Sequence, residues 1–203
     1  MTRITNQETR PYDSPLRAEQ LEETRARILD AAMRVMAGGI ASVSVPAIAR
    51  EAGVSVPTVY RHFRSKAELL TAVYPHVARR LGLDQLPDPT SLDDLRTAIR
   101  RIFERVDAIG DLDRAAMASP GGDEVRHATM PGRLARIGKF VDALDGDLPA
   151  DAKARITRLL TVLTASASLR MWRDHLGASV EQAADDIDFA IRAALAATRR
   201  NEP

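Results

Sequence analysis

The chain has 203 residues, of which 45% are hydrophobic, so it is long enough for one large domain or two small ones with a proper core. It contains no cysteine, which excludes disulfides and thiolate metal sites. Residues 1–80 hold 12 Lys and Arg against 8 Asp and Glu, whereas residues 81–203 hold 17 against 20. This mild asymmetry fits a basic DNA-binding part beside an acidic body, although many soluble enzymes show as much.

The N-terminal residues have no apolar run of the secretory type, and no apolar window of about 18 residues occurs in the chain. We therefore expect a cytoplasmic protein without a membrane span. Residues 1–19 are polar, contain two prolines and predict a flexible arm. Arg3, Arg10 and Arg17 in this arm either reach DNA or are incidental charges of a tail, and the sequence leaves both readings open.

A first helix is expected over 21–37, because its apolar residues recur at helical spacing and Gly38-Gly39 follows them. Two short helices are then expected over 45–52 and 56–63. Ser44 and Ser55 are suited to cap these helices, each with a proline in the first turn. Gly53 between them suits the left-handed turn of a helix-turn-helix.

The sequence GVSVPTVYRHFRSKAELL, which overlaps this motif at about 44–63, resembles the DNA-binding signature of TetR-family transcriptional regulators. In that signature a turn glycine precedes a recognition helix with Thr, Leu/Val-Tyr and His-Phe, and a Lys opens the next helix. The match covers about 22–82. The resulting DNA-contact candidates are Ser55, Val56, Thr58, Tyr60, Arg61, His62 and Lys66.

The chemistry of these side chains assigns different contacts to them. Arg61 is the long donor of the recognition helix and suits a guanine edge, whereas Tyr60 and Lys66 suit phosphates. Two residues depart from the family pattern. Pro46 replaces a polar residue that touches DNA in some members, and apolar Val56 is limited to a thymine methyl group. The alternative is a solvated helix face with a buried Tyr-His pair.

The rest of the chain predicts more helices and no strand. Pro75 is expected to kink one of them, the stretch 119–122 is expected to be a loop, and Pro131-Gly132 is expected to interrupt another helix. The expected helices cover 65–81, 91–109, 111–118, 123–130, 133–144, 150–176 and 179–199.

We therefore predict an all-α protein with three parts: the arm at 1–19, a helix-turn-helix DNA-binding domain at 20–82, and a ligand-binding and dimerisation domain at 83–203. The family resemblance implies that helices 150–176 and 179–199 meet their copies in a second subunit as a four-helix bundle. Their many small residues are compatible with such a bundle but do not prove a dimer.

Seven residues of the body mix apolar bulk with hydroxyl groups, as small-molecule pockets do, and ordinary core positions fit them equally well. They are Phe103, Met117, Met130, Phe140, Thr164, Ser168 and Trp172. The histidines outside the recognition helix lie far apart, and no phosphate loop, nucleophile elbow or HExxH motif occurs. We therefore expect no metal site, no cofactor and no catalytic residue.

The expected function is that of a one-component regulator. A homodimer would bind a palindromic double-stranded DNA operator and would be released by an unknown small-molecule effector. The family resemblance makes repression the default, while activation stays open. The rivals are a DNA-binding regulator without a ligand and, more remotely, an all-helical enzyme.

Overall fold

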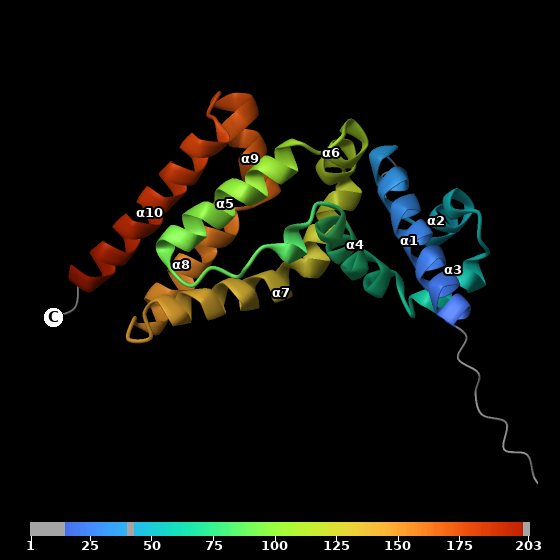
Figure 1. Cartoon of the computed structure of the whole chain (residues 1–203), viewed down its shortest axis with the longest axis horizontal. Coiled ribbons are helices and arrows are strands. Elements are labelled where there is room, and N and C mark those ends of the chain that lie inside the picture. The colour runs from blue at the N-terminus through green and yellow to red at the C-terminus, as the bar shows by residue number, and fades with distance from the viewer. Residues whose placement is uncertain (1–14, 40–42, 201–203) are drawn as a thin grey trace, which may run out of the picture.

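A computed structural model describes residues 15–39 and 43–200, and these ranges are almost entirely helical without any strand, as predicted (Figure 1). The helices are α1 (Pro15–Ala37), α2 (Val45–Ala52), α3 (Val56–His62), α4 (Lys66–Arg80), α5 (Leu92–Asp107), α6 (Asp111–Ala118), α7 (Pro120–Leu144), α8 (Ala150–Leu163), α9 (Ser166–Arg170) and α10 (Val180–Arg200). A 3₁₀ turn, η1 (Leu83–Gln85), and a π-helical turn, η2 (Met171–His175), complete them. Within these ranges no helix is long and apolar enough to cross a membrane.

Helix α1 begins earlier than the sequence predicts. It starts at Pro15 instead of residue 21, so residues 15–19 of the expected arm are helical. Arg17 therefore lies on α1, whereas Arg3 and Arg10 lie outside the described residues.

Local capping forms the helix-turn-helix as predicted. The Ser44 hydroxyl accepts a hydrogen bond from the Ala47 N–H at 3.3 Å, and the Ser55 hydroxyl accepts one from the Thr58 N–H at 3.2 Å. Gly53 has a φ of +67°, a left-handed conformation that glycine adopts without a Cβ clash. These contacts fix the angle at which α3 leaves α2.

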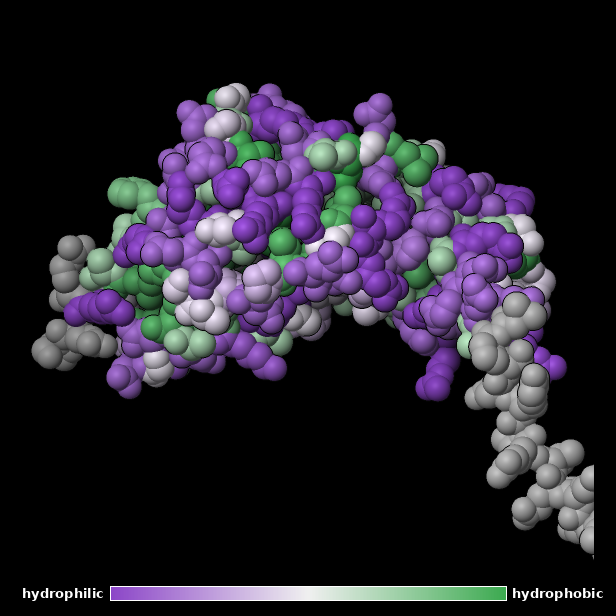
Figure 2. All heavy atoms as spheres, in the orientation of Figure 1, coloured by the Kyte–Doolittle hydropathy of each residue, from purple (hydrophilic) through white to green (hydrophobic). Residues whose placement is uncertain are grey.

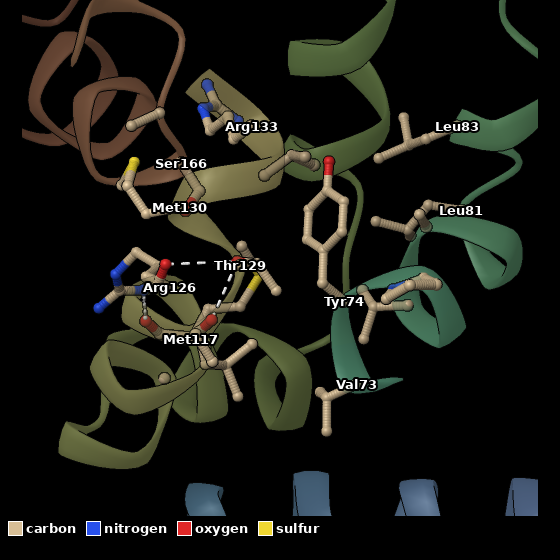
Figure 3. A pocket seen from close by; sticks show the side chains of 18 of the residues that line it. Val73, Tyr74, Leu81, Leu83, Met117, Arg126, Thr129, Met130, Arg133 and Ser166 are labelled. Atoms are coloured by element: carbon tan, nitrogen blue, oxygen red, sulfur yellow. Dashed lines mark hydrogen bonds between the residues drawn. The ribbon is translucent and has the colours of Figure 1, made fainter. Parts of the chain in front are cut away.

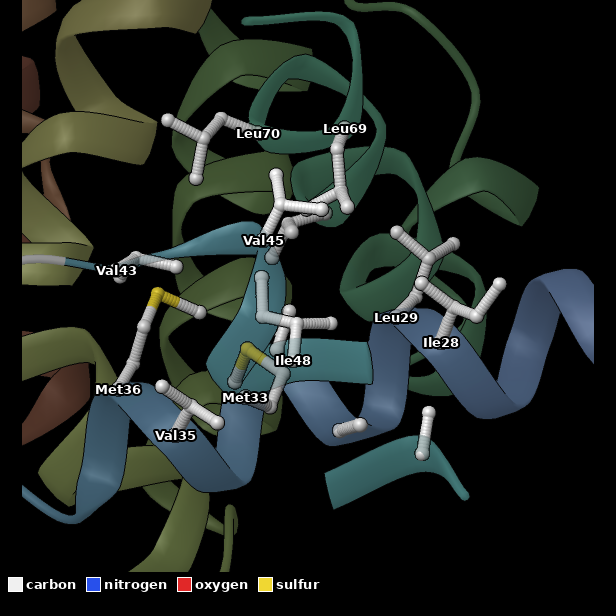
Figure 4. Packing of buried hydrophobic residues seen from close by; sticks show 14 of the residues in the cluster. Ile28, Leu29, Met33, Val35, Met36, Val43, Val45, Ile48, Leu69 and Leu70 are labelled. Atoms are coloured by element: carbon white, nitrogen blue, oxygen red, sulfur yellow. The ribbon is translucent and has the colours of Figure 1, made fainter. Parts of the chain in front are cut away.

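The buried side chains form two clusters. In the first, Ile28, Met33 and Met36 of α1 pack against α2, α3 and α4 (Figure 4). Ala116 of α6 and Val125 of α7 also belong to this cluster, so two later helices complete its packing. The second cluster joins α5, the end of α7, α8, α9 and α10. Figure 1 shows α4, α6 and α7 between these two ends of the molecule.

The predicted loop at 119–122 and the predicted break at Pro131 are both wrong, because α7 runs without interruption from Pro120 to Leu144. Ser119 caps it by accepting the Gly122 N–H at 3.1 Å. Gly121 is a contact point with α1: an added Cβ would lie 2.6 Å from Cγ of Met36. The helix tolerates the one hydrogen bond lost at Pro131 because its two ends are anchored in different cores.

The predicted helix over 150–176 is also wrong as a single element. It divides after Leu163 into α8, α9 and η2, with Ala165 in an extended conformation at the break. The Thr164 hydroxyl donates to the Leu160 carbonyl at 2.6 Å. Hydroxyl side chains compete in this way with the backbone hydrogen bonds of a helix, and the run from Thr164 to Ser168 is rich in them.

Candidate DNA-binding surface and ligand cavity

Helix α3 is anchored by one face and leaves the other free. Val59 of α3 and Phe63, the residue directly after the helix, are each 1% exposed and belong to the core. Ser55, Tyr60 and Arg61 are exposed, with Tyr60 at 48%, and the candidates Val56, Thr58, His62 and Lys66 are half-buried. The seven candidates for DNA contact therefore lie on or beside one short helix, at the far end of the molecule from α10 (Figure 1).

Ser55 and Thr58 are held together at the start of α3. Their hydroxyl oxygens lie 2.8 Å apart, and the Ser55 hydroxyl also accepts the Thr58 N–H. This arrangement fixes the first turn of α3. Each hydroxyl retains further hydrogen-bonding capacity for a base or phosphate oxygen.

His62 is held at the end of α3 by α1. The Arg25 guanidinium donates to the His62 carbonyl at 3.0 Å and lies 4.2 Å from the centre of the Phe63 ring. Burial lowers the pKa of His62 below 6.5, and the positive charges of Arg61 and Arg25 lower it further. The imidazole therefore favours its neutral form at neutral pH.

Lys66, expected to contact phosphate, has a partner in the protein. Its Nζ lies 2.6 Å from a carboxylate oxygen of Glu124 on α7. No local pattern predicts this ion pair, because the two residues lie on helices far apart in the sequence. The pair joins the first turn of α4 to the first turns of α7.

A cavity of about 390 Å³ lies among α4, α5, α6, α7 and the α8–α9 break (Figure 3). Phe103, Met117, Met130 and Thr164 line it, as the sequence suggested. The other three candidates do not. Phe140 and Trp172 pack against the second core cluster, and the Ser168 hydroxyl hydrogen-bonds to the Val162 carbonyl.

The cavity also contains polar groups that the sequence analysis did not select, among them Tyr74 of α4 and Arg133 of α7. Nη2 of Arg133 donates to the Thr164 hydroxyl at 2.7 Å, while its buried Nε has no partner among the described residues. Burial lowers the pKa of Arg133. Its helical position was visible in the sequence, but its neighbours were not, because they come from distant helices.

A second polar cluster joins α1, α4 and α6. His76 Nε2 lies 2.7 Å from a carboxylate oxygen of Asp30, and Arg80 pairs with both Asp30 and Asp113. No local sequence pattern indicates this partner for His76, because Asp30 lies on a distant helix. The cluster therefore ties the second half of α4 to α1 and α6.

No group of three or more His, Cys, Asp and Glu side chains able to hold a metal ion occurs in the described part of the chain.

Comparison with known proteins places residues 28–73 in a family described as "Bacterial regulatory proteins, tetR family". The HTH-type transcriptional regulator SrpR of Pseudomonas putida is 46% identical over 72 residues, which cover 35% of this chain and 34% of SrpR. The match to the regulator TtgW, also of Pseudomonas putida, is 44% identical and covers 35% of this chain and 54% of TtgW. The matched part of the chain thus spans about a third of the length of SrpR and about half of the length of TtgW.

A longer match is to the HTH-type transcriptional repressor KstR of Mycolicibacterium smegmatis, 29% identical over 194 residues, covering 89% of this chain and 91% of KstR. Among solved structures, NalD of Pseudomonas aeruginosa superposes with a TM-score of 0.59 at 21% identity, covering 87% of this chain and 97% of NalD. A TetR transcriptional regulator from Rhodococcus sp. RHA1 superposes with a TM-score of 0.53 at 23% identity, covering 86% of this chain and 97% of that regulator. At these identities the superpositions establish a shared fold.

Proposed function

We propose that the chain, whose residues 28–73 match the family of bacterial regulatory proteins of the TetR type, is a one-component repressor of that family. A homodimer binds a palindromic operator in the cytoplasm and leaves it when a small molecule occupies the cavity. The observation that carries the proposal is the exposed face of α3, which presents Tyr60 and Arg61 outward from a helix anchored by Val59.

The proposed DNA contacts follow the chemistry of this face. Arg61 reads a base edge together with Thr58, while Val56 meets a thymine methyl group. Ser55, Tyr60, His62 and Lys66 position α3 on the backbone, where uncharged groups also serve as donors to phosphate oxygens. Lys66 must exchange Glu124 for a phosphate to do so.

The proposed dimer interface lies on α8 and α10. Val162 of α8 and Phe189 of α10 are 64% and 73% exposed, which is unusual for large apolar side chains on a helical surface. Small residues, among them Ala190 and Ala193, are exposed on α10 beside Phe189 and would permit close approach of a second copy. Figure 2 shows hydrophobic residues near the C-terminal end of the molecule, as well as in its middle and near α6, on a largely hydrophilic surface.

We propose that 20–82 acts as the DNA-binding domain and 83–203 as the ligand-binding and dimerisation domain. Helix α4 runs from the DNA end at Lys66 to the cavity at Tyr74 and Leu81, so a ligand in the cavity contacts the helix that follows α3. A ligand changes DNA affinity only if it binds the two conformations with different affinity.

The cavity favours this ligand-responsive reading over a ligand-independent regulator. Activation instead of repression uses the same contacts, and a reporter gene placed behind the operator distinguishes the two by the sign of the response. No enzymatic activity is part of the proposal.

Selection of bound duplexes from a random DNA pool tests the function directly. We expect an inverted repeat whose half-sites are centred about one helical turn apart. Arg61→Ala should relax the base preference at one position in each half-site. Recovery of unrelated sequences, or of single half-sites by a monomer, would refute the proposed dimeric operator binding.

A further inference from the structure

The charged side chains that line the cavity all carry the same sign. They are three arginines, Arg126, Arg133 and Arg136, and no Asp, Glu, Lys or His of the described chain accompanies them in the lining. The remaining lining residues are mainly apolar, with a few hydroxyl groups. A ligand in this cavity would therefore contact mainly apolar side chains and, among charged groups, only the positively charged guanidinium groups of the described lining.

The three arginines differ in how they are satisfied. Arg126 donates to the Met117 carbonyl at 2.6 Å and pairs with Asp123, while Arg136 is exposed to solvent. Arg133 is the exception. Its hydrogen bond to Thr164 is to a neutral hydroxyl, and its Nε is buried without a partner in the described residues. No described carboxylate pairs with it, and burying a cation without a counter-charge is unfavourable.

The position of Arg133 is nevertheless fixed. Thr164 holds its Nη2 at 2.7 Å, and the same threonine is anchored by its own hydrogen bond to the Leu160 carbonyl. The break between α8 and α9 places Thr164 in this position. A guanidinium held in one orientation presents its remaining N–H donors as a fork, which matches the two oxygens of a carboxylate or the oxygens of a phosphate.

We propose that the cavity binds an amphipathic anion, with a hydrocarbon body against the apolar lining and one terminal oxyanion, carboxylate or phosphate, on Arg133. Figure 3 shows Tyr74 extending from α4 into the cavity, with Arg133 on the opposite side. A molecule seated on Arg133 therefore meets Tyr74 and contacts α4. Binding itself does not depend on the repressor function, but the role of this anion as effector rests on it.

Calorimetric titration of the DNA-free protein with four decyl compounds tests the site. Decanoate and decyl phosphate carry the anion, decanol has no charge, and decylamine has the opposite charge. In the wild type, at least one anion should bind about tenfold or more tightly than decanol, as expected for a charge-assisted hydrogen bond. The stronger of the two anions identifies the head group.

Two variants show whether Arg133 is responsible. In Arg133→Gln the preference for the anion over decanol should fall to about one, whereas Arg101→Gln should retain it. Arg101 is an exposed residue of α5 outside the cavity lining and outside the proposed dimer interface, which makes it the matched control. An undiminished preference in Arg133→Gln would overturn the proposal.

Two wild-type results would also overturn it, so the test does not depend on the folding of a variant. In the first, decanol or decylamine binds as tightly as both anions. In the second, none of hexanoate, decanoate, tetradecanoate and decyl phosphate binds detectably.

Operator release separates this site from the repressor function. If decanoate binds through Arg133 but leaves operator affinity unchanged, the anion site stands and the effector role fails. If neither anion binds and a different compound releases the operator equally from wild type and Arg133→Gln, the repressor function stands and the anion site fails.

Discussion

Arg61 on α3 and Arg133 on α7 place the same side chain in opposite environments. Arg61 is exposed at the proposed DNA surface, where water and salt ions already satisfy its charge. Arg133 lies in a mainly apolar cavity, where Thr164 and no described carboxylate accompany it. In the proposed complexes, Arg61 would gain binding energy by exchanging solvent for phosphate or base, and Arg133 would gain it from a counter-charge that no described residue supplies.

This difference predicts how each site responds to salt. Exposed charges are screened within about 8 Å at physiological ionic strength, so binding at α3 should weaken steeply as salt rises. An enclosed charge is screened less. Anion binding in the cavity should therefore depend less on salt than operator binding does, which titrations of both at several salt concentrations will measure.

The largest effect is expected from a change that touches neither arginine. Phe189→Glu removes a large apolar side chain from the proposed dimer interface and places a charge there. We expect dimerisation to weaken by roughly 3–5 kcal/mol, from lost apolar burial and the cost of a buried charge. Analytical ultracentrifugation should find monomers that bind the operator poorly although α3 is intact.

Leu112→Glu on α6 is the control for this prediction, because Leu112 is also exposed but lies outside α8 and α10. If Phe189→Glu stays dimeric and Leu112→Glu does not, the interface lies on another face.

Arg61→Ala should cost roughly 1–3 kcal/mol on the preferred operator, the value of a bidentate contact with a base. On scrambled DNA the loss should be smaller. Arg61→Lys keeps the charge but not the fork, so it should keep the salt dependence and still lose base preference. Equal losses on both DNA sequences, measured by fluorescence anisotropy, would make Arg61 a backbone contact.

Pro75→Ala should weaken the coupling between the two regions, which for allosteric proteins is typically about 1–3 kcal/mol. Pro75 lines the cavity beside Tyr74 and lies within α4, where it removes one helical hydrogen bond. We expect the ratio of operator affinities with and without effector to shrink. Pro131→Ala in α7 is the control, and an unchanged ratio in Pro75→Ala would indicate that α4 moves as a rigid lever.

The ion pair between Lys66 and Glu124 should give a smaller effect. Glu124→Gln frees Lys66 for phosphate, so operator affinity should rise by roughly 0.2–1 kcal/mol, the usual range for a partly exposed pair. Lys66→Ala should instead weaken binding to all sequences and reduce the salt slope by about one. A salt slope that Lys66→Ala leaves unchanged would remove Lys66 from the phosphate contacts.

The smallest effect concerns His62, whose pKa is lowered in the folded protein. Below about pH 6.5 the unfolded chain binds the proton more readily than the folded one, so acidification costs stability. The stability that comes from neutral His62 is complete above this pH and declines as the pH falls through the lowered value. Thermal melts of wild type and His62→Gln, at about pH 8 and about pH 5, should show a smaller loss in the variant.

The sequence predicts those parts of the structure that local chemistry determines. Ser44 and Ser55 cap helices where expected, and Ser179, the first residue of the range expected for α10, exchanges two hydrogen bonds with Gln182 as in a capping box. The exposed face of α3 follows from the same local rules, because two anchors on a short helix leave its other side free.

The cavity was only partly predictable, because its geometry depends on packing between distant segments. Local rules interpret Gly121 and Pro131 as breaks, yet α7 begins at Pro120 with Gly121 packed against Met36 and continues through Pro131 to Leu144. The division after Leu163 depends on hydroxyl contacts that the apolar pattern does not reveal. Since Arg133 meets Thr164 only through these two features, no pattern within either helix could have paired them.

The contact of α6 and α7 with α1 limits how this regulator can be recombined with others. Joining its residues 20–82 to the body of a different protein would remove Ala116, Val125 and the glycine at 121, and would leave Met36 to face whatever side chain took their place. A functional chimera would therefore have to carry α6 and the first turns of α7 along with the DNA-binding helices. The unit that can be transplanted is defined by this packing and is discontinuous in the chain.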